Sequence, residues 1–328
     1  MITRRNLVIA LGAGALSAAL SARAQQQGKV WRIGYLSAAT RDTSVDVEQG
    51  FLAGLRELGY AEGRNILLER RYAAGDVKRL PGIAAEFVAL KVDVILATSP
   101  PGALAARDAT TMIPIVIAGM ADPVGNRLAK SLSRPGGNVT GLSTLNVELA
   151  AKRFELLKEC LPKTARVAFL HDPEVQENVA YHEASLGPAR KFGMQFNPVP
   201  VRRVEDFAAA FATAVKNRAD AMLVVASPLF FVNRARIAEL ALQARLPTMF
   251  NRHEFVEAGG LMTYSVDNVD VYRRAAAYVD KILRGAKPAD LPIEQPTKFL
   301  LVINLKTAKA LGIKIPQSIL FRADRVIE

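Results

Sequence analysis

Two stretches of the sequence end an apolar run with a serine followed by proline. They read VDVILATSPP (92–101) and ADAMLVVASP (219–228). Serine is favoured at a helix N-cap and proline suits the first helical turn, so the pattern predicts helix starts at Ser99 and Ser227. A helix start can present free N–H groups and a positive dipole end to an anion such as a ligand carboxylate. Plain helix capping explains the same residues equally well.

Further polar side chains stand where apolar runs end. Ser37 ends the first run, Thr98 precedes Ser99, and Asn251 follows LPTMF (246–250). In open parallel sheets, ligands bind beyond the carboxyl ends of the strands. We therefore expect these side chains to face a ligand.

Two short carboxylates, Asp122 and Asp172, also follow apolar runs. Either could receive an ammonium group through a charge-assisted hydrogen bond. Because Asp122 precedes proline, turn initiation is an equal explanation for it. Tyr264 lies in a later apolar run, where it could line a cleft or fill a core.

The sequence shows no catalytic or metal-binding pattern. It has no G-x-S-x-G elbow and no Walker loop, and its one cysteine, Cys160, lies on an apolar helix face as a buried thiol with no disulfide partner. His171, His182 and His253 each precede an acidic residue, but neighbours in a strand face opposite ways. We expect no metal, no cofactor and no enzyme. An α/β hydrolase-like enzyme using the same cleft is the alternative function, and it requires a nucleophile with an oriented base.

Apolar strands alternate with helices along the first part of the chain. The chain has 328 residues and is 50% hydrophobic, which favours about two domains. Continuous apolar strands separated by helices indicate a parallel sheet covered on both faces. The expected strands are 31–37, 65–73, 92–98 and 113–120, with helices over 47–60, 77–91 and from 101.

The same order then recurs. The run ARVAFLHD (165–172) corresponds to WRIGYLS (31–37), the run over 220–227 to that over 92–98, and LPTMF to IPIVI (113–117). Three corresponding strands in one order predict two similar α/β lobes. Helices are expected over 147–161, about 177–192, 206–217, 235–246, 270–285 and, as a short helix, 305–312, and strands over 259–267 and 298–304.

The last part of the chain is too short to form a domain and must complete the lobes already made. We therefore expect the chain to cross between the lobes more than once. The predicted division places residues 29–143 and 268–292 in the first lobe, and residues 144–267 and 293–328 in the second.

The first 24 residues, MITRRNLVIALGAGALSAALSARA, have a basic start, an apolar stretch and an A-x-A site. This predicts a signal peptide and a periplasmic protein. The run Thr3–Leu7 resembles a twin-arginine export signal loosely. No cysteine follows, so a lipid anchor is not expected. An uncleaved N-terminal anchor is the alternative.

The formal net charge is +12. The basic residues are scattered, and no helix-turn-helix or basic–aromatic pattern accompanies them. A solvated basic surface is therefore favoured over nucleic-acid binding. A repressor-type regulator would need a DNA-binding headpiece where the export signal stands.

Two stretches resemble a known family. They are residues 121–162, which include SRPGGNVTGLSTLNVELAAKRFELLKECLP, and GGLMTYSVD (259–267) with 289–328. Both are similar to the ABC-transporter substrate-binding proteins of the tryptophan/tyrosine-type group. The resemblance implies a type I periplasmic-binding-protein fold, α/β, with two doubly wound, Rossmann-like lobes joined by crossover hinge strands and closing on a ligand.

The resemblance also implies a site and partners. It implies a small polar or amphipathic ligand, such as an amino acid or a carboxylate, and an ABC transporter permease in the inner membrane. Few aromatic residues stand near the strand ends, so the tryptophan label is not carried over. The implied ligand-binding residues are Ser37, Thr98, Ser99, Asp122, Asp172, Ser227, Asn251 and Tyr264.

Overall fold

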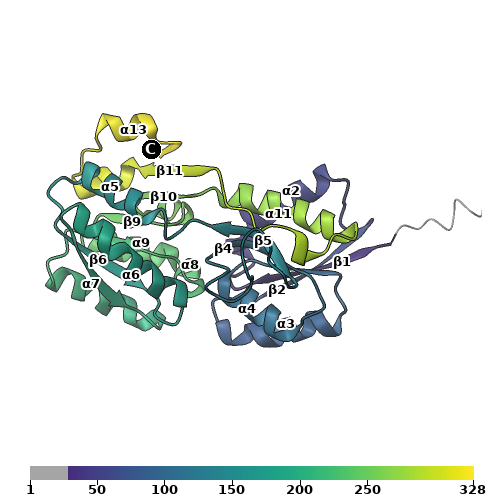
Figure 1. Cartoon of the computed structure of the whole chain (residues 1–328). Helices are drawn as coiled ribbons and strands as arrows, with labels where there is room; N and C mark the ends of the chain where they lie inside the picture. Colours follow the sequence, from purple (N-terminus) through teal and green to yellow (C-terminus); the bar gives the residue numbers. More distant parts are fainter. Residues whose placement is uncertain (1–28) are drawn as a thin grey trace, which may run out of the picture.

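The structure is a computed structural model that describes residues 29–328. The predicted signal peptide, residues 1–24, lies outside the described residues. Two sheets with their covering helices form two halves of the molecule, which lie side by side in Figure 1. We call the half that contains β1 the first lobe and the half that contains β6 the second lobe.

The first lobe is built on a five-stranded parallel sheet in the order β2-β1-β3-β4-β5. Helices α2 and α11 cover one face, and α3 and α4 cover the other. The strands are β1 (Trp31–Ser37), β2 (Ile66–Tyr72), β3 (Val94–Ala97), β4 (Ile115–Ala121) and β5 (Val139–Thr144). The helices are α2 (Val45–Glu57), α3 (Leu80–Ala89), α4 (Pro100–Ala109) and α11 (Asn268–Leu283).

The second lobe has a seven-stranded sheet in the order β12-β11-β10-β9-β8-β6-β7. All pairs are parallel except β10 with β11. The strands are β6 (Arg166–His171), β7 (Gln195–Pro200), β8 (Ala221–Val224), β9 (Thr248–Phe250), β10 (Met262–Val266), β11 (Phe299–Asn304) and β12 (Arg325–Ile327). The helices are α5 (Ala150–Cys160), α6 (Gln176–Lys191), α7 (Phe207–Lys216), α8 (Pro228–Val232), α9 (Arg234–Gln243), α10 (Glu254–Glu257), α12 (Leu305–Leu311) and α13 (Gln317–Arg322).

Both lobes share one strand order. Read from the β7 side, the second sheet runs β7-β6-β8-β9-β10, which matches β2-β1-β3-β4-β5 strand for strand. This order places a topological switch between β1 and β3, and another between β6 and β8, where ligands bind in doubly wound sheets. The prediction of two doubly wound α/β lobes is confirmed. The additional strands β11 and β12 extend the second sheet.

The core strands are buried on both faces, as their apolar runs require. Every residue of β3 and of β8 is buried, and a separate apolar cluster lies on each face of each sheet. Cys160 is buried in one of these clusters, and burial raises the pKa of its thiol to about 11.

Helices α2 and α11 approach each other closely although they are far apart in sequence. A Cβ atom on Gly50 would lie 2.7 Å from the Val269 carbonyl oxygen, and one on Gly54 would lie 2.2 Å from the Arg273 carbonyl oxygen. Only glycine fits at these positions, so α11 is fixed to the first lobe although it follows β10 of the second (Figure 1).

Three segments cross between the lobes. They are residues 145–149 after β5, Asp267 after β10, and residues 284–298 before β11. The second and third crossovers are joined by the ion pair between Asp267 and Lys298, at 2.6 Å. The third lies against β5, because the amide of Ser143 donates to the carbonyl of Glu294.

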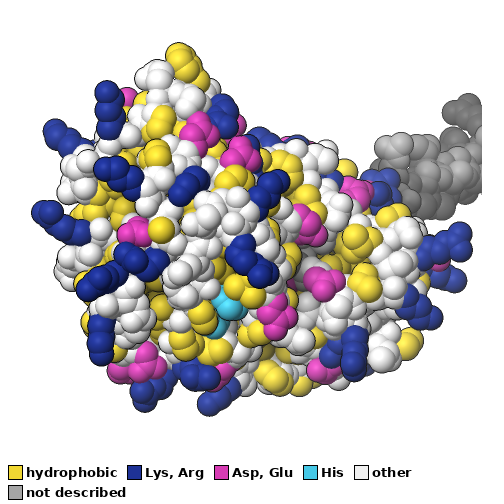
Figure 2. Space-filling model, turned by 60° about the vertical axis from the view of Figure 1, so that its left-hand side comes forward, with side chains coloured by type: hydrophobic (Ala, Val, Ile, Leu, Met, Phe, Trp, Pro, Cys, Tyr) yellow, Lys and Arg dark blue, Asp and Glu magenta, His cyan; other side chains and the backbone are white. Residues whose placement is uncertain are grey.

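Lysine and arginine side chains are dispersed over the face drawn in Figure 2, among aspartate and glutamate side chains. Along residues 29–328, no helix is both long and apolar enough to cross a bilayer.

Candidate ligand-binding cleft

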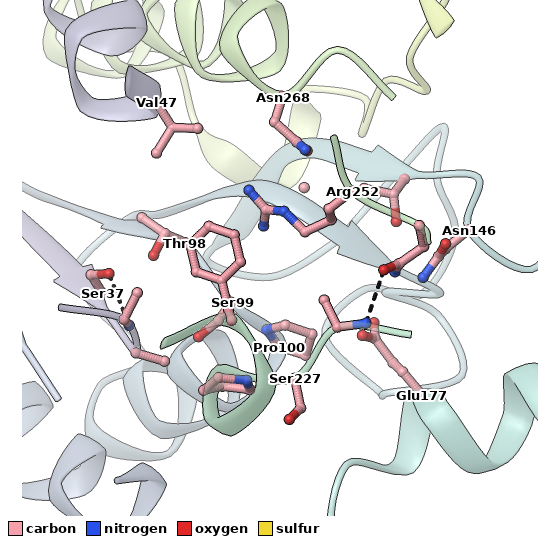
Figure 3. Close-up of a pocket in the computed structure, with 18 of the residues that line it drawn as sticks. Ser37, Val47, Thr98, Ser99, Pro100, Asn146, Glu177, Ser227, Arg252 and Asn268 are labelled. Carbon is pink, nitrogen blue, oxygen red and sulfur yellow. Dashed lines mark hydrogen bonds between the residues drawn. The ribbon is translucent and has the colours of Figure 1, made fainter. Parts of the chain in front are cut away.

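One pocket lies between the lobes at the carboxyl ends of the strands. It encloses about 970 Å³ that no protein atom fills, part of it open to solvent. Residues after β1 and β3 line it from the first lobe, residues after β8 and β9 line it from the second, and Asn146 of the first crossover contributes as well (Figure 3). We call it the cleft pocket. Of the residues predicted from the sequence, it brings together Ser37, Thr98, Ser99, Ser227 and Asn251.

The hydroxyl groups after β1 and β3 are held by nearby backbone and side chains. Ser37 Oγ accepts from the amide of Ala39 at 3.2 Å and lies 3.2 Å from Ser44 Oγ. Thr98 Oγ1 donates to the carbonyl of Leu36, also at 3.2 Å. These contacts fix the directions of the hydroxyl groups at the edge of the cleft pocket.

The two serine–proline helix starts act as plain caps. Ser99 Oγ accepts from the amide of Gly102, and Ser227 Oγ from the amide of Phe230, each at 3.2 Å. The first two residues of α4 are Pro100 and Pro101, which have no N–H group. The expectation that α4 presents free N–H groups to an anion is therefore wrong for its first turn.

Asn251 follows β9 and contacts the loop after β8. Its Oδ1 accepts from the amide of Ala226 at 2.9 Å. This bond ties the two loops that the second lobe contributes to the cleft pocket.

Asp122 and Asp172 line hollows that adjoin the cleft pocket. Asp122 has a positive φ of 42° and accepts from the amide of Gly125 at 2.8 Å, so it forms the turn that its proline neighbour suggested. Asp172 accepts from the amide of Glu174 at 3.0 Å, and burial raises its pKa.

Tyr264 lies away from the cleft pocket, between the two cores. Its ring stacks on Phe299 with centroids 6.1 Å apart. The alternative that Tyr264 fills a core is the one that the structure shows.

An apolar wall, which the sequence analysis did not predict, lines one part of the cleft pocket. Phe231 from α8, Tyr272 from α11 and Val47 from α2 contribute to it. The Tyr272 hydroxyl donates to the carbonyl of Thr98 at 3.2 Å, and burial raises the pKa of this tyrosine to about 12. Phe231 stands four residues after Ser227, so a wider search beyond the strand end would have found it.

The pocket also holds charged residues that the sequence analysis missed. Arg252 stacks over the Phe231 ring, 4.4 Å from its centroid, and extends from the second lobe toward Thr98 of the first (Figure 3). Its Nη2 lies 2.6 Å from Glu254 Oε1. Burial alone would raise the pKa of Glu254, but Arg252 lowers it to about 2. Arg153 and Glu177 line the pocket as well.

The site residues offer no metal centre. Within residues 29–328, no group of three His, Cys, Asp or Glu side chains is placed to hold a metal ion. The donors of the cleft pocket are hydroxyl, amide and guanidinium groups, which suit an organic ligand.

Comparisons with known proteins point in one direction. The model of a family described as "ABC transporter substrate binding protein" matches residues 33–327. A tyrosine-binding protein of Clostridioides difficile (strain R20291) is 27% identical over 281 residues, covering 85% of this chain and 80% of the relative.

Two solved structures are similar over the same region. The crystal structure of an ABC domain in complex with L-Trp from Streptococcus pneumoniae is 27% identical, with a TM-score of 0.85, covering 91% of this chain and all (100%) of the other. A ligand-free, open substrate-binding protein with adhesive properties from Clostridium difficile is 25% identical, with a TM-score of 0.67, covering 91% and 99%. At similar identity, the arrangement of this chain is closer to that of the L-Trp complex.

Proposed function

Because the chain belongs to the ABC transporter substrate-binding protein family, we propose that it is the solute receptor of an ABC importer and closes its two lobes on a small amphipathic amino acid. One observation carries the proposal. A single pocket takes polar side chains from both lobes and has an apolar wall on one side. A ligand bound there contacts both lobes at once, so it favours the closed arrangement.

The lining supports an amino acid as the ligand. Phe231 and Tyr272 offer apolar surface for a side chain, and Arg153 and Glu177 offer charges of both signs for a zwitterionic head group. The relatives are described as binding tyrosine and L-Trp, so aromatic amino acids are the first ligands to test. Of the predicted residues, we propose Ser37, Thr98, Ser99, Ser227 and Asn251 as direct contacts. Asp122 and Asp172 belong to the adjoining hollows.

The family is one of substrate-binding proteins and not of enzymes, so the chain is not an enzyme. The hydrolase-like alternative is set aside on this ground.

Location and partner follow from the role. Members of this family bind solutes outside the cytoplasm, and the sequence of residues 1–24 supports export by a signal peptide to the periplasm without a lipid anchor. The proposed partner is an ABC transporter permease in the inner membrane, which would accept the ligand from the closed receptor.

We keep the predicted division of the chain as part of the proposal. Residues 29–143 with 268–292 form the first lobe, and residues 144–267 with 293–328 form the second. The packing of α11 on α2 and the pairing of β11 with β10 support this assignment.

Calorimetry with the 20 standard L-amino acids tests the function. We expect L-tyrosine or L-tryptophan to bind with roughly micromolar affinity, since about 15 heavy atoms at ~0.5 kcal/mol each give about −8 kcal/mol. Absence of heat with every amino acid would contradict the proposed ligand class. Native mass spectrometry of the purified protein would then show whether another small molecule is bound.

The substitution Phe231→Ala places the ligand in the cleft pocket. Removing a phenyl ring that contacts the ligand costs about 1.5–3 kcal/mol, so affinity should fall roughly 10- to 100-fold. Phe321→Ala is the matched control, because Phe321 is 82% exposed on α13, outside the cleft pocket. Equal affinities of the two variants would show that the ligand binds elsewhere.

A further inference from the structure

Arg153 is a buried cation in the wall of the cleft pocket. It lies in the first turn of α5 and is only 1% exposed. Its Nε donates to the carbonyl of Tyr264 at 2.9 Å, and its Nη1 donates to the carbonyl of Asn146 at 2.9 Å and to the hydroxyl of Tyr181 at 3.2 Å. These acceptors are all neutral, so they orient the guanidinium group without cancelling its charge.

Among residues 29–328, no acidic side chain forms an ion pair with Arg153. None of the ion pairs within residues 29–328 includes Arg153, whereas Arg252 in the same pocket is paired with Glu254 at 2.6 Å and Arg70 with Glu48 at 2.6 Å. A buried charge without a partner is costly. An anion brought by the ligand would remove that cost.

One donor group of Arg153 is left for such an anion. In the part of the chain that the structure describes, Nε and Nη1 have acceptors but Nη2 has none. Because the residue lines the cleft pocket, Nη2 is the donor group that Arg153 has left for a ligand there. The start of α4, by contrast, has prolines where free N–H groups would be needed.

We propose that Arg153 binds the carboxylate of the ligand through Nη2. The receptor would then bind amino acids with a free carboxylate more tightly than the corresponding amides, or the amines that lack the carboxylate. This inference rests on the proposed amino-acid function and assigns the group that sets its specificity. Because Nε donates to Tyr264 within β10 and Nη1 donates to Asn146 in the first crossover, the charge that meets the ligand is positioned in part by the hinge itself.

The test compares L-tryptophan, L-tryptophan amide and tryptamine by calorimetry at pH 7, with the corresponding tyrosine series in parallel. Losing a hydrogen bond to a charged group reduces affinity roughly 10- to 100-fold. We expect the wild-type protein to bind the amino acid more tightly than the amide by that factor. In Arg153→Gln this ratio should fall, so that the affinity for the amino acid exceeds that for the amide only about threefold or less, because a neutral donor does not strongly favour a charged ligand group over a neutral one.

Two further variants make the assignment specific. Lys152→Gln, on the same helix but paired with Glu155 at the surface, is the matched control and should keep the wild-type ratio. Arg252→Gln should keep most of it, since Arg252 already has Glu254 as its counter-charge. Loss of the ratio in Arg252→Gln together with its retention in Arg153→Gln would overturn the assignment.

The comparison of the acid with the amide in the wild-type protein tests the inference even if the Arg153→Gln variant does not fold. Equal binding of the acid and the amide by the wild-type protein would overturn the inference while leaving the receptor function intact. If no amino acid binds at all, the proposed function fails and the inference fails with it. Arg153→Lys, which keeps the charge but loses the forked geometry, should retain part of the ratio.

Discussion

The two arginines of the cleft, Arg153 buried and Arg252 partly buried, are held in different ways. Arg252 is matched by Glu254 within its own lobe and stacks on Phe231, so its charge is balanced before any ligand arrives. Arg153 has only neutral acceptors. A pocket in which the buried Arg153 lacks an ion-pair partner is suited to a ligand that carries a negative charge. Arg252, which is paired with Glu254, instead offers the ligand the flat polar surface of its guanidinium group.

The ion pair of Glu254 makes stability depend on pH. Its pKa is about 2 in the folded protein against an ordinary value of 4.5. A carboxyl group whose pKa is lower in the folded state stabilises the fold above its unfolded value. That contribution should be lost as the pH falls from about 4.5 to about 2.

The variant Glu254→Gln should be less stable at pH 7 by roughly 1–3 kcal/mol, because the partly buried Arg252 then loses its partner. Its stability should also fall less between pH 5 and pH 3, since the group that titrates is gone. Urea unfolding at the three pH values measures both effects. A variant as stable as the wild type at pH 7 would show that the pair contributes little.

Individual site residues differ in how far the sequence reveals them. Ser99 and Ser227 could be placed near the cleft because an apolar run followed by serine and proline fixes a strand end and a helix start. Arg153 could not, because it stands among lysine and glutamate residues in AAKRFELLKEC and looks like a surface residue. Its burial arises only where the first crossover, β10 and α6 meet, which are contacts between distant segments.

At the scale of elements, the positions of helices were predictable and their partners were not. The expected helices over 47–60 and 270–285 correspond to α2 and α11, but local periodicity cannot show that one packs on the other. The contact depends on Gly50 and Gly54, whose missing side chains let the backbone of α11 approach. In the last part of the chain, the expected strand over 298–304 and short helix over 305–312 correspond to β11 and α12, while β12 and α13 were not predicted from their short, mixed sequences.

Gly54→Ala should destabilise the protein. The new methyl group would lie 2.2 Å from the Arg273 carbonyl oxygen, so the helices must move apart, at a cost of about 1–3 kcal/mol or more. Gly82→Ala in α3 is the matched control, because nothing lies within 4 Å of its Cβ position. It should be neutral or stabilising by up to ~1 kcal/mol, as alanine favours a helix interior. Thermal unfolding of both variants measures this difference in stability, and equal melting temperatures would contradict the close packing of α2 and α11.

At the scale of the whole molecule, the lobes are in contact across the cleft. A Cβ atom built on Gly75 would lie 3.1 Å from a methyl group of Val232 in α8, and Ala39 packs against the apolar cluster of the second lobe. The higher similarity to the L-Trp complex than to the ligand-free, open structure agrees with a closed arrangement. The sequence predicted two lobes and several crossovers, but the angle between the lobes depends on weak contacts across the cleft.

Small-angle X-ray scattering should detect the closing of the lobes. Without ligand, we expect a radius of gyration larger than the value calculated from this structure, and with a saturating amino acid we expect the two to agree. The ligand supplies contacts with both lobes, so it favours the closed population. A radius that matches the closed value with and without ligand would mean that the lobes stay together in its absence.

The position of α11 in the chain has a consequence for how the protein is made. This helix covers one face of the first sheet, yet it follows β10, the last strand that the second sheet shares with the first-lobe order. During synthesis from the N-terminus, the glycine surface of α2 therefore has no partner until residue 283 has left the ribosome. The first lobe, although most of it is translated before the second, therefore stays incomplete until most of the second lobe has also been made.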